Sequence, residues 1–575
     1  MAGVIVEKNV EAKLRDGTVL RGDVYRPAED GPHPVLLMRT PYNKDVLALT
    51  ILHLDPIKAA SNGFIVAVQD VRGRWASDGD TFFLYRNEFD DGYDSVDWAA
   101  NLPGCSGAVG AFGVSYMGGT AWHAAATAPP ALKAISTCTS PNDFIVNHVR
   151  RGGAFLLGTF VQWSLLSIGP NAMMRAKAGS PDFLPSLVQL IDDIDGFEDR
   201  VRHMPLTEFP PARVDDDTFL PFFKEILARD VPDELTRSMS VSDKHDRIEV
   251  PALIMAGWYD LLLASDLEHY ASMKTEAATE EARAKTKLVI APWSHGMFLN
   301  VVGELDFGIR SSGLLMDLKE DLTAMQLRWF SQRLSGIDTG IDDEPRVKIF
   351  VQGINRWRDE DDWPLSRAVD TPWFLGAGDA LSPAAPGPDE EHDSYVYDPS
   401  DPCPTLGGNL LMPRTYVPGP VEQSPILGRS DVLTYTSEPF SADLEFTGHV
   451  KAVLYAATDA PDTDWVVKLC VVYEDGRTFN VVDGIMRGSY RNGPERTLVD
   501  PGAVERYDID LWATSIVIRA GQRLRVVVTS SDFPRYDRNP NNGELGVEAT
   551  ATVPARQRIF HDAERASHVL LPVIP

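Results

Sequence analysis

The sequence predicts a parallel α/β sheet domain that is interrupted by a helical insertion and followed by a β-sandwich domain. Short apolar runs alternate with helix-like segments near the N-terminus and again after residue 250, whereas the stretch between them lacks strand signals. After residue 352 the chain is dominated by short alternating strands and turns. At 575 residues it is also too long for one hydrophobic core, which favours several domains.

The first α/β part is assigned to residues 1–142. It opens with a predicted β-hairpin, because alternating apolar and polar residues flank the turn at Asp16-Gly17. Four apolar runs of buried-strand length follow, separated by helix-like segments: residues 35–39, 64–69, 108–112 and 131–138. This alternation is typical of a parallel sheet covered by helices.

An inserted helical cap domain is expected at residues 143–243. Strand signals are missing there, and residues 184–194 and 220–229 have helical patterns. The uncharged stretch 152–170 approaches the length of a membrane span, but its glycines and polar residues favour a buried helical hairpin that covers the active site. The α/β pattern resumes at Pro251 and ends with a strand at 347–351, which makes residues 244–352 the second α/β part.

Residues 353–575 predict a C-terminal β-sandwich. Proline and glycine are dense at 372–388, and alternating strands are expected at 449–456, 465–473 and 523–529. By composition alone this domain also fits a carbohydrate-binding module. Scattered tryptophans such as Trp465 and Trp512 are, however, more typical of a core than of a ligand platform.

A candidate nucleophile lies where the apolar run 108–112 ends. The residues that follow are Gly113-Val114-Ser115-Tyr116-Met117-Gly118. A glycine-flanked serine between a strand and a helix is typical of the nucleophile elbow, although the second glycine here comes one position late. A small serine in a structural turn is the alternative interpretation.

The order of two later residues favours the catalytic interpretation. Asp260 follows a predicted buried strand at 251–257, and His295 follows another at 287–291. Ser115, Asp260 and His295 thus occur in the chain order of an α/β hydrolase, each just past the carboxyl end of a strand. A lone histidine after a strand is more often structural, but three residues in this order predict a triad.

These motifs, with several others along the chain, resemble those of the cocaine-esterase-like acyl hydrolases related to X-Pro dipeptidyl peptidases. The other motifs are Arg39-Thr40-Pro41-Tyr42-Asn43-Lys44, Gln69-Asp70-Val71-Arg72-Gly73, Gly257-Trp258-Tyr259-Asp260, Pro292-Trp293-Ser294-His295, Trp357-Arg358-Asp359-Glu360 and Phe533-Pro534-Arg535-Tyr536-Asp537-Arg538-Asn539. The resemblance spans essentially the whole chain. It implies an α/β-hydrolase fold, a helical cap and a C-terminal jelly roll that forms one wall of the active site.

The predicted chemistry is acyl transfer to Ser115, with His295 as general base and Asp260 orienting the imidazole. The backbone amide of Tyr116, directly after the nucleophile, is expected to donate to the oxyanion. The second donor is less evident, because no glycine-rich oxyanion loop follows the strand at 35–39. The resemblance gives this role to the phenol of Tyr42.

The substrate is expected to be a carboxylic ester with a hydrophobic or aromatic acyl group. The resemblance implies a pocket among the cap, the triad loops and the jelly roll, with Trp163, Leu262, Leu411 and Met412 near the substrate. Related α-amino-acid ester hydrolases bind an ammonium with carboxylates near the acid loop, but Asp260 is followed here by leucines. The chain starts almost at the hairpin, without the extra N-terminal domain of X-Pro dipeptidyl peptidases. Amide, peptide or β-lactam acyl hydrolysis is the alternative, and a noncatalytic binding protein on a hydrolase scaffold is the rival class.

Composition restricts the partners. Lys and Arg number 54 against 83 Asp and Glu, a formal net charge of −29, which disfavours nucleic acid. Four cysteines without disulfide or metal-ligand spacing, and an N-terminus without signal-peptide features, favour the cytoplasm. We expect no cofactor, no metal and no membrane partner, and the oligomeric state stays open, with a homodimer as one option.

Asp70, Arg72 and Asp78 are interpreted as structural ion-pair residues near the elbow.

Overall fold

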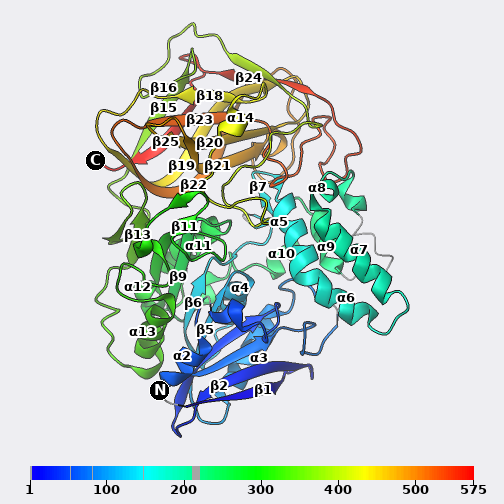
Figure 1. The fold of residues 1–575 in the computed structure, drawn as a ribbon, viewed down its shortest axis with the longest axis vertical. Helices are drawn as coiled ribbons and strands as arrows, with labels where there is room; N and C mark the ends of the chain where they lie inside the picture. The colour runs from blue at the N-terminus through cyan, green and yellow to red at the C-terminus, as the bar shows by residue number, and fades with distance from the viewer. Residues whose placement is uncertain (1–2, 52, 81, 147, 210–219) are drawn as a thin grey trace.

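We analysed a computed structural model of the chain, which describes residues 3–51, 53–80, 82–146, 148–209 and 220–575. Three parts are visible in Figure 1: an α/β part built from the N-terminal and central residues, a group of helices at its side, and a strand-rich C-terminal part above both. The α/β and strand-rich parts agree with the sequence prediction.

The α/β part contains a 10-stranded sheet in the order β1-β2-β4-β3-β5-β6-β9-β10-β13-β14. Its strands are β1 (Val4–Lys13), β2 (Val19–Pro27), β3 (His33–Thr40), β4 (Ile65–Asp70), β5 (Cys105–Val114), β6 (Leu132–Cys138), β9 (Ala252–Tyr259), β10 (Lys287–Ser294), β13 (Val347–Val351) and β14 (Arg356–Glu360). The strands from β4 to β13 in this order run parallel, whereas β2 pairs antiparallel with β4, β1 with β2, and β14 with β13. The order reverses at β3, whose neighbours are β4 and β5, so the loops after β3 and β5 lie at a topological switch point.

Helices cover both faces of this sheet, which explains why its strands are continuous apolar runs. Along β3, Val35 and Leu37 belong to the core that includes α3 (Glu88–Ala100), α4 (Tyr116–Ala125) and α11 (Leu263–Glu276). Leu36 and Met38 point to the opposite core, which includes α2 (Pro56–Ser61) and α13 (Leu322–Ser335). The shorter elements of this part are α1 (Leu47–Ile51), α12 (Glu280–Lys285), β11 (Val301–Val302) and β12 (Leu305–Asp306).

The insertion is mainly helical. It contains β7 (Arg150–Arg151), β8 (Ala154–Phe155), α5 (Leu157–Gln162), a π-helix at Trp163–Ile168, α6 (Gly169–Lys177), α7 (Phe183–Asp195), α8 (Phe197–Arg200), α9 (Pro221–Leu227) and α10 (Glu234–Ser238). The helices predicted at 184–194 and 220–229 correspond to α7 and α9. The first two residues of the 152–170 stretch form the β7–β8 turn, and the hairpin predicted within it is wrong. Instead, α5, the π-helix and α6 follow one another without a break, and α7 packs against the π-helix and α6. None of the helices in the described ranges combines the length and apolar character that a membrane crossing requires.

The C-terminal part contains an 11-stranded sheet in the order β17-β24-β19-β25-β15-β16-β18-β23-β20-β21, with β22 paired to β19. Its elements are β15 (Val369–Gly376), β16 (Ala380–Ser382), β17 (Asp393–Tyr397), α14 (Ser424–Leu427), β18 (Leu433–Thr436), β19 (Leu444–Thr458), β20 (Asp464–Val472), β21 (Thr478–Arg487), β22 (Glu505–Ile518), β23 (Arg523–Thr529), β24 (Ala555–Phe560) and β25 (His568–Val573). Trp465 and Trp512 are both buried, so neither offers an exposed platform for a ligand.

A buried polar network joins this sheet to the helical insertion. Asp537 accepts a hydrogen bond from the amide of Phe155 at 2.7 Å and pairs with Arg487 at 2.9 Å. The amide of Gly158, in the first turn of α5, donates to the carbonyl of Pro534 at 2.9 Å. The segment 533–539 therefore anchors the start of the helical run, and this accounts for Asp537 in its sequence motif.

We predict that Asp537→Asn lowers the free energy of unfolding by about 3–5 kcal/mol, because Arg487 would lose one of its two buried carboxylate partners. Urea denaturation followed by circular dichroism measures the change. The matched control is Asp508→Asn, which removes an exposed partner of Arg506 and should cost less than about 1 kcal/mol. Equal effects of the two substitutions would show that the network does not hold the parts together.

Candidate functional site

Ser115 lies in a sharp turn between β5 and α4. Its φ of 58° and ψ of −129° are unusual for a residue with a side chain, as expected for a strained elbow. A Cβ at Gly113 would lie 2.3 Å from the backbone of Met117, and one at Gly118 would lie 2.7 Å from Ser140. The close approaches therefore require glycine at 113 and 118, whereas position 117 tolerates a buried methionine.

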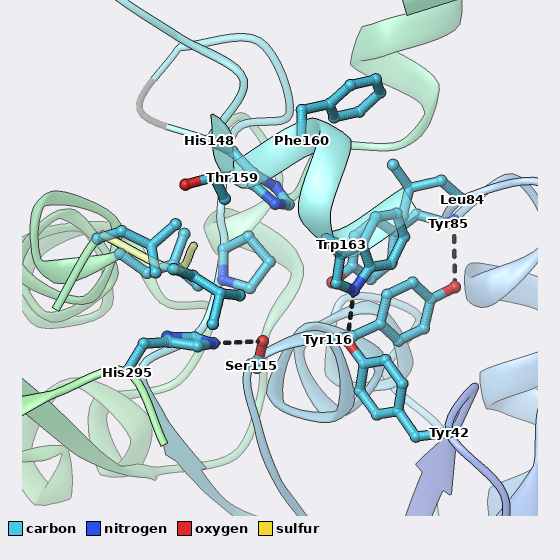
Figure 2. Close-up of a pocket in the computed structure, with 14 residues that line it drawn as sticks. Tyr42, Leu84, Tyr85, Ser115, Tyr116, His148, Thr159, Phe160, Trp163 and His295 are labelled. Carbon is cyan, nitrogen blue, oxygen red and sulfur yellow. Dashed lines mark hydrogen bonds between the residues drawn. The ribbon is translucent and has the colours of Figure 1, made fainter. Parts of the chain in front are cut away.

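His295 and Asp260 form a hydrogen-bonded chain with Ser115. His295 Nε2 lies 2.9 Å from Ser115 Oγ, and Nδ1 lies 2.9 Å from Asp260 Oδ2 (Figure 2 shows the first contact). Asp260 follows β9 and His295 follows β10, and these strands are parallel neighbours, so their carboxyl ends bring both side chains to one edge of the sheet. The three residues predicted as a triad are thus brought together.

The loop of Asp260 is held by a residue from the C-terminal part. Asn409 is buried, and its amide group donates to the backbone carbonyl of Asp260 at 2.7 Å and to that of Trp258 at 3.1 Å. Asp260 Oδ1 also accepts from the amide of Leu262 at 2.8 Å. Sequence reasoning missed Asn409, because a single asparagine after two glycines has no distinctive pattern.

Tyr42 lies beside the elbow, where its ring meets Tyr116 edge-on at 6.4 Å between centroids. Its hydroxyl oxygen accepts a hydrogen bond of 2.8 Å from Trp163 Nε1, at the first residue of the π-helix (Figure 2). Burial raises the pKa of Tyr42 to about 12, an effect that hydrogen bonds with Trp163 and Ser115 partly oppose. The phenol is therefore a neutral donor at physiological pH.

Tyr116 is the first residue of α4, so its backbone amide lies among the helix N-terminal donors that lack a partner in the preceding turn. Its side chain is held from behind. The ring stacks on Tyr85 with centroids 4.1 Å apart, and the hydroxyl donates to Glu88 at 3.0 Å. Glu88 is paired in turn with Arg39 at 2.5 Å.

A pocket that is partly open to solvent lies above Ser115 and His295. Its described lining residues are Tyr42, Leu84, Tyr85, Ser115, Tyr116, Pro141, His148, Thr159, Phe160, Trp163, Leu261, Leu262, His295 and Leu411. Of the four residues predicted near the substrate, Trp163, Leu262 and Leu411 are in this set. Met412 is not; its side chain packs against Gly158 of α5 instead.

Comparison with known proteins gives the family. The model of the X-Pro dipeptidyl-peptidase (S15 family) matches residues 16–297, and that of the X-Pro dipeptidyl-peptidase C-terminal non-catalytic domain matches residues 339–570. Cocaine esterase from Rhodococcus sp. (strain MB1 Bresler) is 36% identical over 99% of this chain and 98% of its own. The chain belongs to the cocaine-esterase-like family.

Two solved structures of similar fold align with nearly the whole length of this chain. An α-amino acid ester hydrolase aligns with a TM-score of 0.79 at 24% identity, over 99% of this chain and 96% of its own. An aminopeptidase from a marine sediment Thaumarchaeota archaeon aligns with a TM-score of 0.80 at 23% identity, over 100% and 97% of the two chains.

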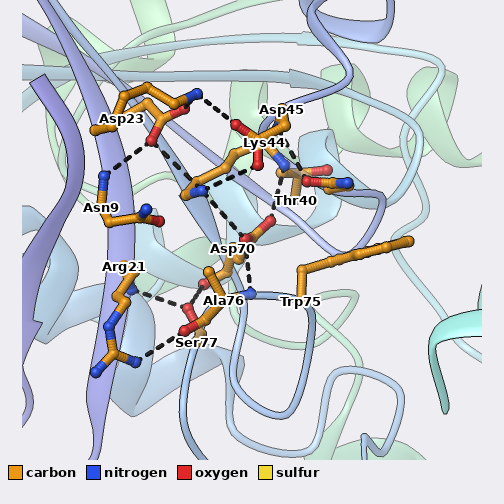
Figure 3. Close-up of polar contacts among 12 residues, drawn as sticks. Asn9, Arg21, Asp23, Thr40, Lys44, Asp45, Asp70, Trp75, Ala76 and Ser77 are labelled. Carbon is orange, nitrogen blue, oxygen red and sulfur yellow. Dashed lines mark hydrogen bonds and ion pairs between the residues drawn. The ribbon is translucent and has the colours of Figure 1, made fainter. Parts of the chain in front are cut away.

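Two motifs of this cocaine-esterase-like chain converge on the loop that carries Tyr42. Asp70 accepts hydrogen bonds from the amides of Lys44 at 2.8 Å and Ala76 at 3.2 Å (Figure 3). Arg74 and Trp75 both donate to the carbonyl of Pro41 at 2.9 Å. Arg74 also donates to the carbonyl of Ile168 at 3.0 Å, so one side chain ties the Tyr42 loop to the π-helix that carries Trp163.

The other loop charges have structural contacts as well. Arg72 pairs with Asp91 at 2.6 Å, and Asp78 pairs with Arg21 at 2.6 Å. Burial raises the pKa of Asp70 to about 6. Within the described ranges, no group of three or more His, Cys, Asp or Glu side chains is arranged to hold a metal ion.

We predict that Asn409→Ala lowers kcat by about ten- to hundredfold with a smaller change in KM, because a loosened Asp260 loop misplaces His295 while the cavity wall stays intact. Steady-state kinetics on a chromogenic ester measures both constants. The control is Asn492→Ala, an exposed asparagine of the C-terminal part. A kcat equal to that of the control would contradict the role of Asn409 in positioning the acid loop.

Proposed function

We propose that this protein is a serine carboxylesterase that forms an acyl-enzyme on Ser115. The observation that carries the proposal is the continuous hydrogen-bonded chain from Ser115 Oγ through His295 to Asp260 at the floor of a mostly apolar cavity. The similarity to cocaine esterase over the whole chain supports an ester as the substrate. An intact nucleophile, base and acid in contact argue against a noncatalytic binding protein.

In the proposed mechanism, Ser115 attacks the ester carbonyl while His295 Nε2 accepts the hydroxyl proton. Asp260 holds Nδ1 of His295 and stabilises the imidazolium, which then protonates the departing alcohol. A water molecule activated by His295 hydrolyses the acyl-enzyme in the same way. The Asp260–His295 contact is largely buried, with side chains 0% and 8% exposed, so their attraction is little screened by solvent.

The proposed oxyanion donors are the phenol of Tyr42 and the backbone amide of Tyr116. The Tyr42 oxygen accepts the bond from Trp163 Nε1, so that bond does not use the phenolic proton, which can be donated to the substrate. Because burial keeps this phenol protonated, it can donate to a developing negative charge throughout the catalytic cycle.

The domain division also belongs to the proposal: a cap at residues 143–243 and a jelly roll at 353–575, inserted in and appended to the α/β-hydrolase parts at 1–142 and 244–352. Support comes from the cavity itself, where Trp163 and Phe160 are contributed by the helical insertion and Leu411 by the C-terminal part.

The apolar walls favour a hydrophobic or aromatic acyl group. A cytoplasmic location is proposed as well, in keeping with the unpaired thiols of Cys138, Cys403 and Cys470.

Peptide or amide hydrolysis is the second candidate, because the matching family model describes X-Pro dipeptidyl peptidases. A panel of chromogenic esters and dipeptidyl anilides separates the two. We expect kcat/KM for the best ester to exceed that for any anilide, and the reverse order would favour the peptidase.

Ser115→Ala should lower ester hydrolysis by a factor on the order of 10⁴ or more without unfolding the protein, since only the nucleophilic hydroxyl is removed. The purified variant is assayed with a chromogenic ester and its melting temperature is compared with the parent. Ser424→Ala, an exposed serine, is the control and should retain full activity. Residual turnover of more than a few per cent would disprove the assignment of the nucleophile.

Tyr42→Phe should lower kcat by about 10²–10³, which corresponds to about 3–4 kcal/mol of transition-state stabilisation. KM should change little, because the ground-state carbonyl carries less charge than the oxyanion. Tyr455→Phe on β19 is the matched control, remote from the cavity and expected to be neutral. If Tyr42→Phe kept its kcat on both an activated and an unactivated ester, the second donor would be another group.

A further inference from the structure

Three residues of the cavity wall have a buried polar side-chain atom without a hydrogen-bond partner among the described residues: His148 Nδ1, Thr159 Oγ1 and the hydroxyl of Tyr85. The Tyr85 hydroxyl packs against Gly119 of α4, where a Cβ would lie 2.8 Å from it. Figure 2 shows His148 and Thr159 on the side of the cavity opposite Ser115 and His295. Neither residue has a role in the proposed acyl transfer.

Such groups need an explanation, because buried polar atoms in proteins are almost always paired. Thr159 lies in α5, where a threonine hydroxyl can bond to a carbonyl of the preceding turn, yet this one is unpaired. The His148 ring is held edge-on against Phe144, with centroids 5.3 Å apart and planes at 72°. The His148 ring is thus held by an aromatic contact, and His148 Nδ1 and Thr159 Oγ1 are both available to bond another group.

The charge of the cavity restricts what that group can be. Among its described lining residues there is no Asp, Glu, Lys or Arg. Burial, with a smaller contribution from His295, lowers the pKa of His148 to about 4. The ring is therefore neutral near pH 7 and offers one donor and one acceptor nitrogen. A buried ammonium or carboxylate would lack a counter-charge here, whereas a neutral polar group would not need one.

We propose that His148 and Thr159 form a subsite that binds a neutral hydrogen-bonding substituent of the ester, such as a hydroxyl or carbonyl group. The proposal rests on the esterase function above and names its substrate class: neutral esters with an aromatic or hydrophobic body that carries such a substituent. Trp163, Phe160 and Tyr116 supply the aromatic surface for the body, and the His148–Thr159 pair selects the substituent.

The test compares matched esters on matched variants. The p-nitrophenyl ester of phenylacetic acid, called the plain ester below, is compared with the p-nitrophenyl esters of meta- and para-hydroxyphenylacetic acid. The measured quantity is kcat/KM for a hydroxylated ester divided by kcat/KM for the plain ester. We expect the wild type to favour at least one hydroxylated ester. His148→Phe and Thr159→Val should each lower that ratio about three- to tenfold, the effect of one neutral hydrogen bond. His148→Asn and Thr159→Ser retain a polar atom and should preserve most of it.

A ratio that is unchanged in both His148→Phe and Thr159→Val, with hydrolysis of the plain ester retained, would overturn the proposal. Failure of the esterase function itself is distinguishable, because the wild type would then hydrolyse none of the three esters. Inhibitor binding to the wild type provides a second test, which does not depend on whether the variants fold. Hydroxyphenylacetamide should inhibit at least threefold more tightly than phenylacetamide for one positional isomer. Equal inhibition by the plain and both hydroxylated amides would also overturn the proposal.

Discussion

The turn at Ser115 is the constraint on which the rest of the site depends. A residue with positive φ directly after a buried parallel strand places the serine hydroxyl beyond the sheet edge, and the surrounding backbone must approach closely for this to happen. The turn lies beside the switch point of the strand order, where the loop after β3 diverges and brings Tyr42 next to it. The carboxyl ends of β9 and β10 then supply Asp260 and His295 from the same edge.

No single part of the chain forms the site alone. The α/β sheet supplies the reacting groups, the helical insertion supplies Trp163, and the C-terminal part supplies Asn409 and Leu411. Because Asp537 and Pro534 anchor the start of the helical run, the position of Trp163, and with it the Tyr42 hydroxyl, depends on a contact between the insertion and the C-terminal sheet. Stability of that contact and geometry of the site are therefore coupled.

The sequence predicted best those site residues that follow a recognisable local pattern. Ser115, Asp260 and His295 each follow an apolar strand, and this placement, together with the glycine-flanked elbow and the chain order Ser, Asp, His, was enough to select them. Asn409 and His148 could not be found in this way, because their surroundings are made by distant segments. Adjacent residues can also differ: Leu411 lines the cavity, whereas the side chain of Met412 packs against Gly158 of α5, and the sequence does not distinguish the two. The uncharged stretch 152–170 indicated burial correctly, but its glycines and serines suggested a hairpin where the chain forms a π-helix.

The charges around the site are arranged so that they support its loops without entering the cavity. Arg39 and Glu88 lie behind the Tyr116 ring, and Asp70 and Arg74 lie behind the Tyr42 loop. The described cavity wall itself holds only apolar side chains and neutral polar groups above the Asp260–His295 pair. In such a low-dielectric space, a hydrogen bond to the oxyanion is stronger than it would be in water, and a neutral donor that is already oriented needs no reorganisation during the reaction. In the proposed mechanism the buried ion pairs therefore act indirectly, because they fix the neutral donors of Tyr42 and Tyr116 where a charged group would have to be desolvated.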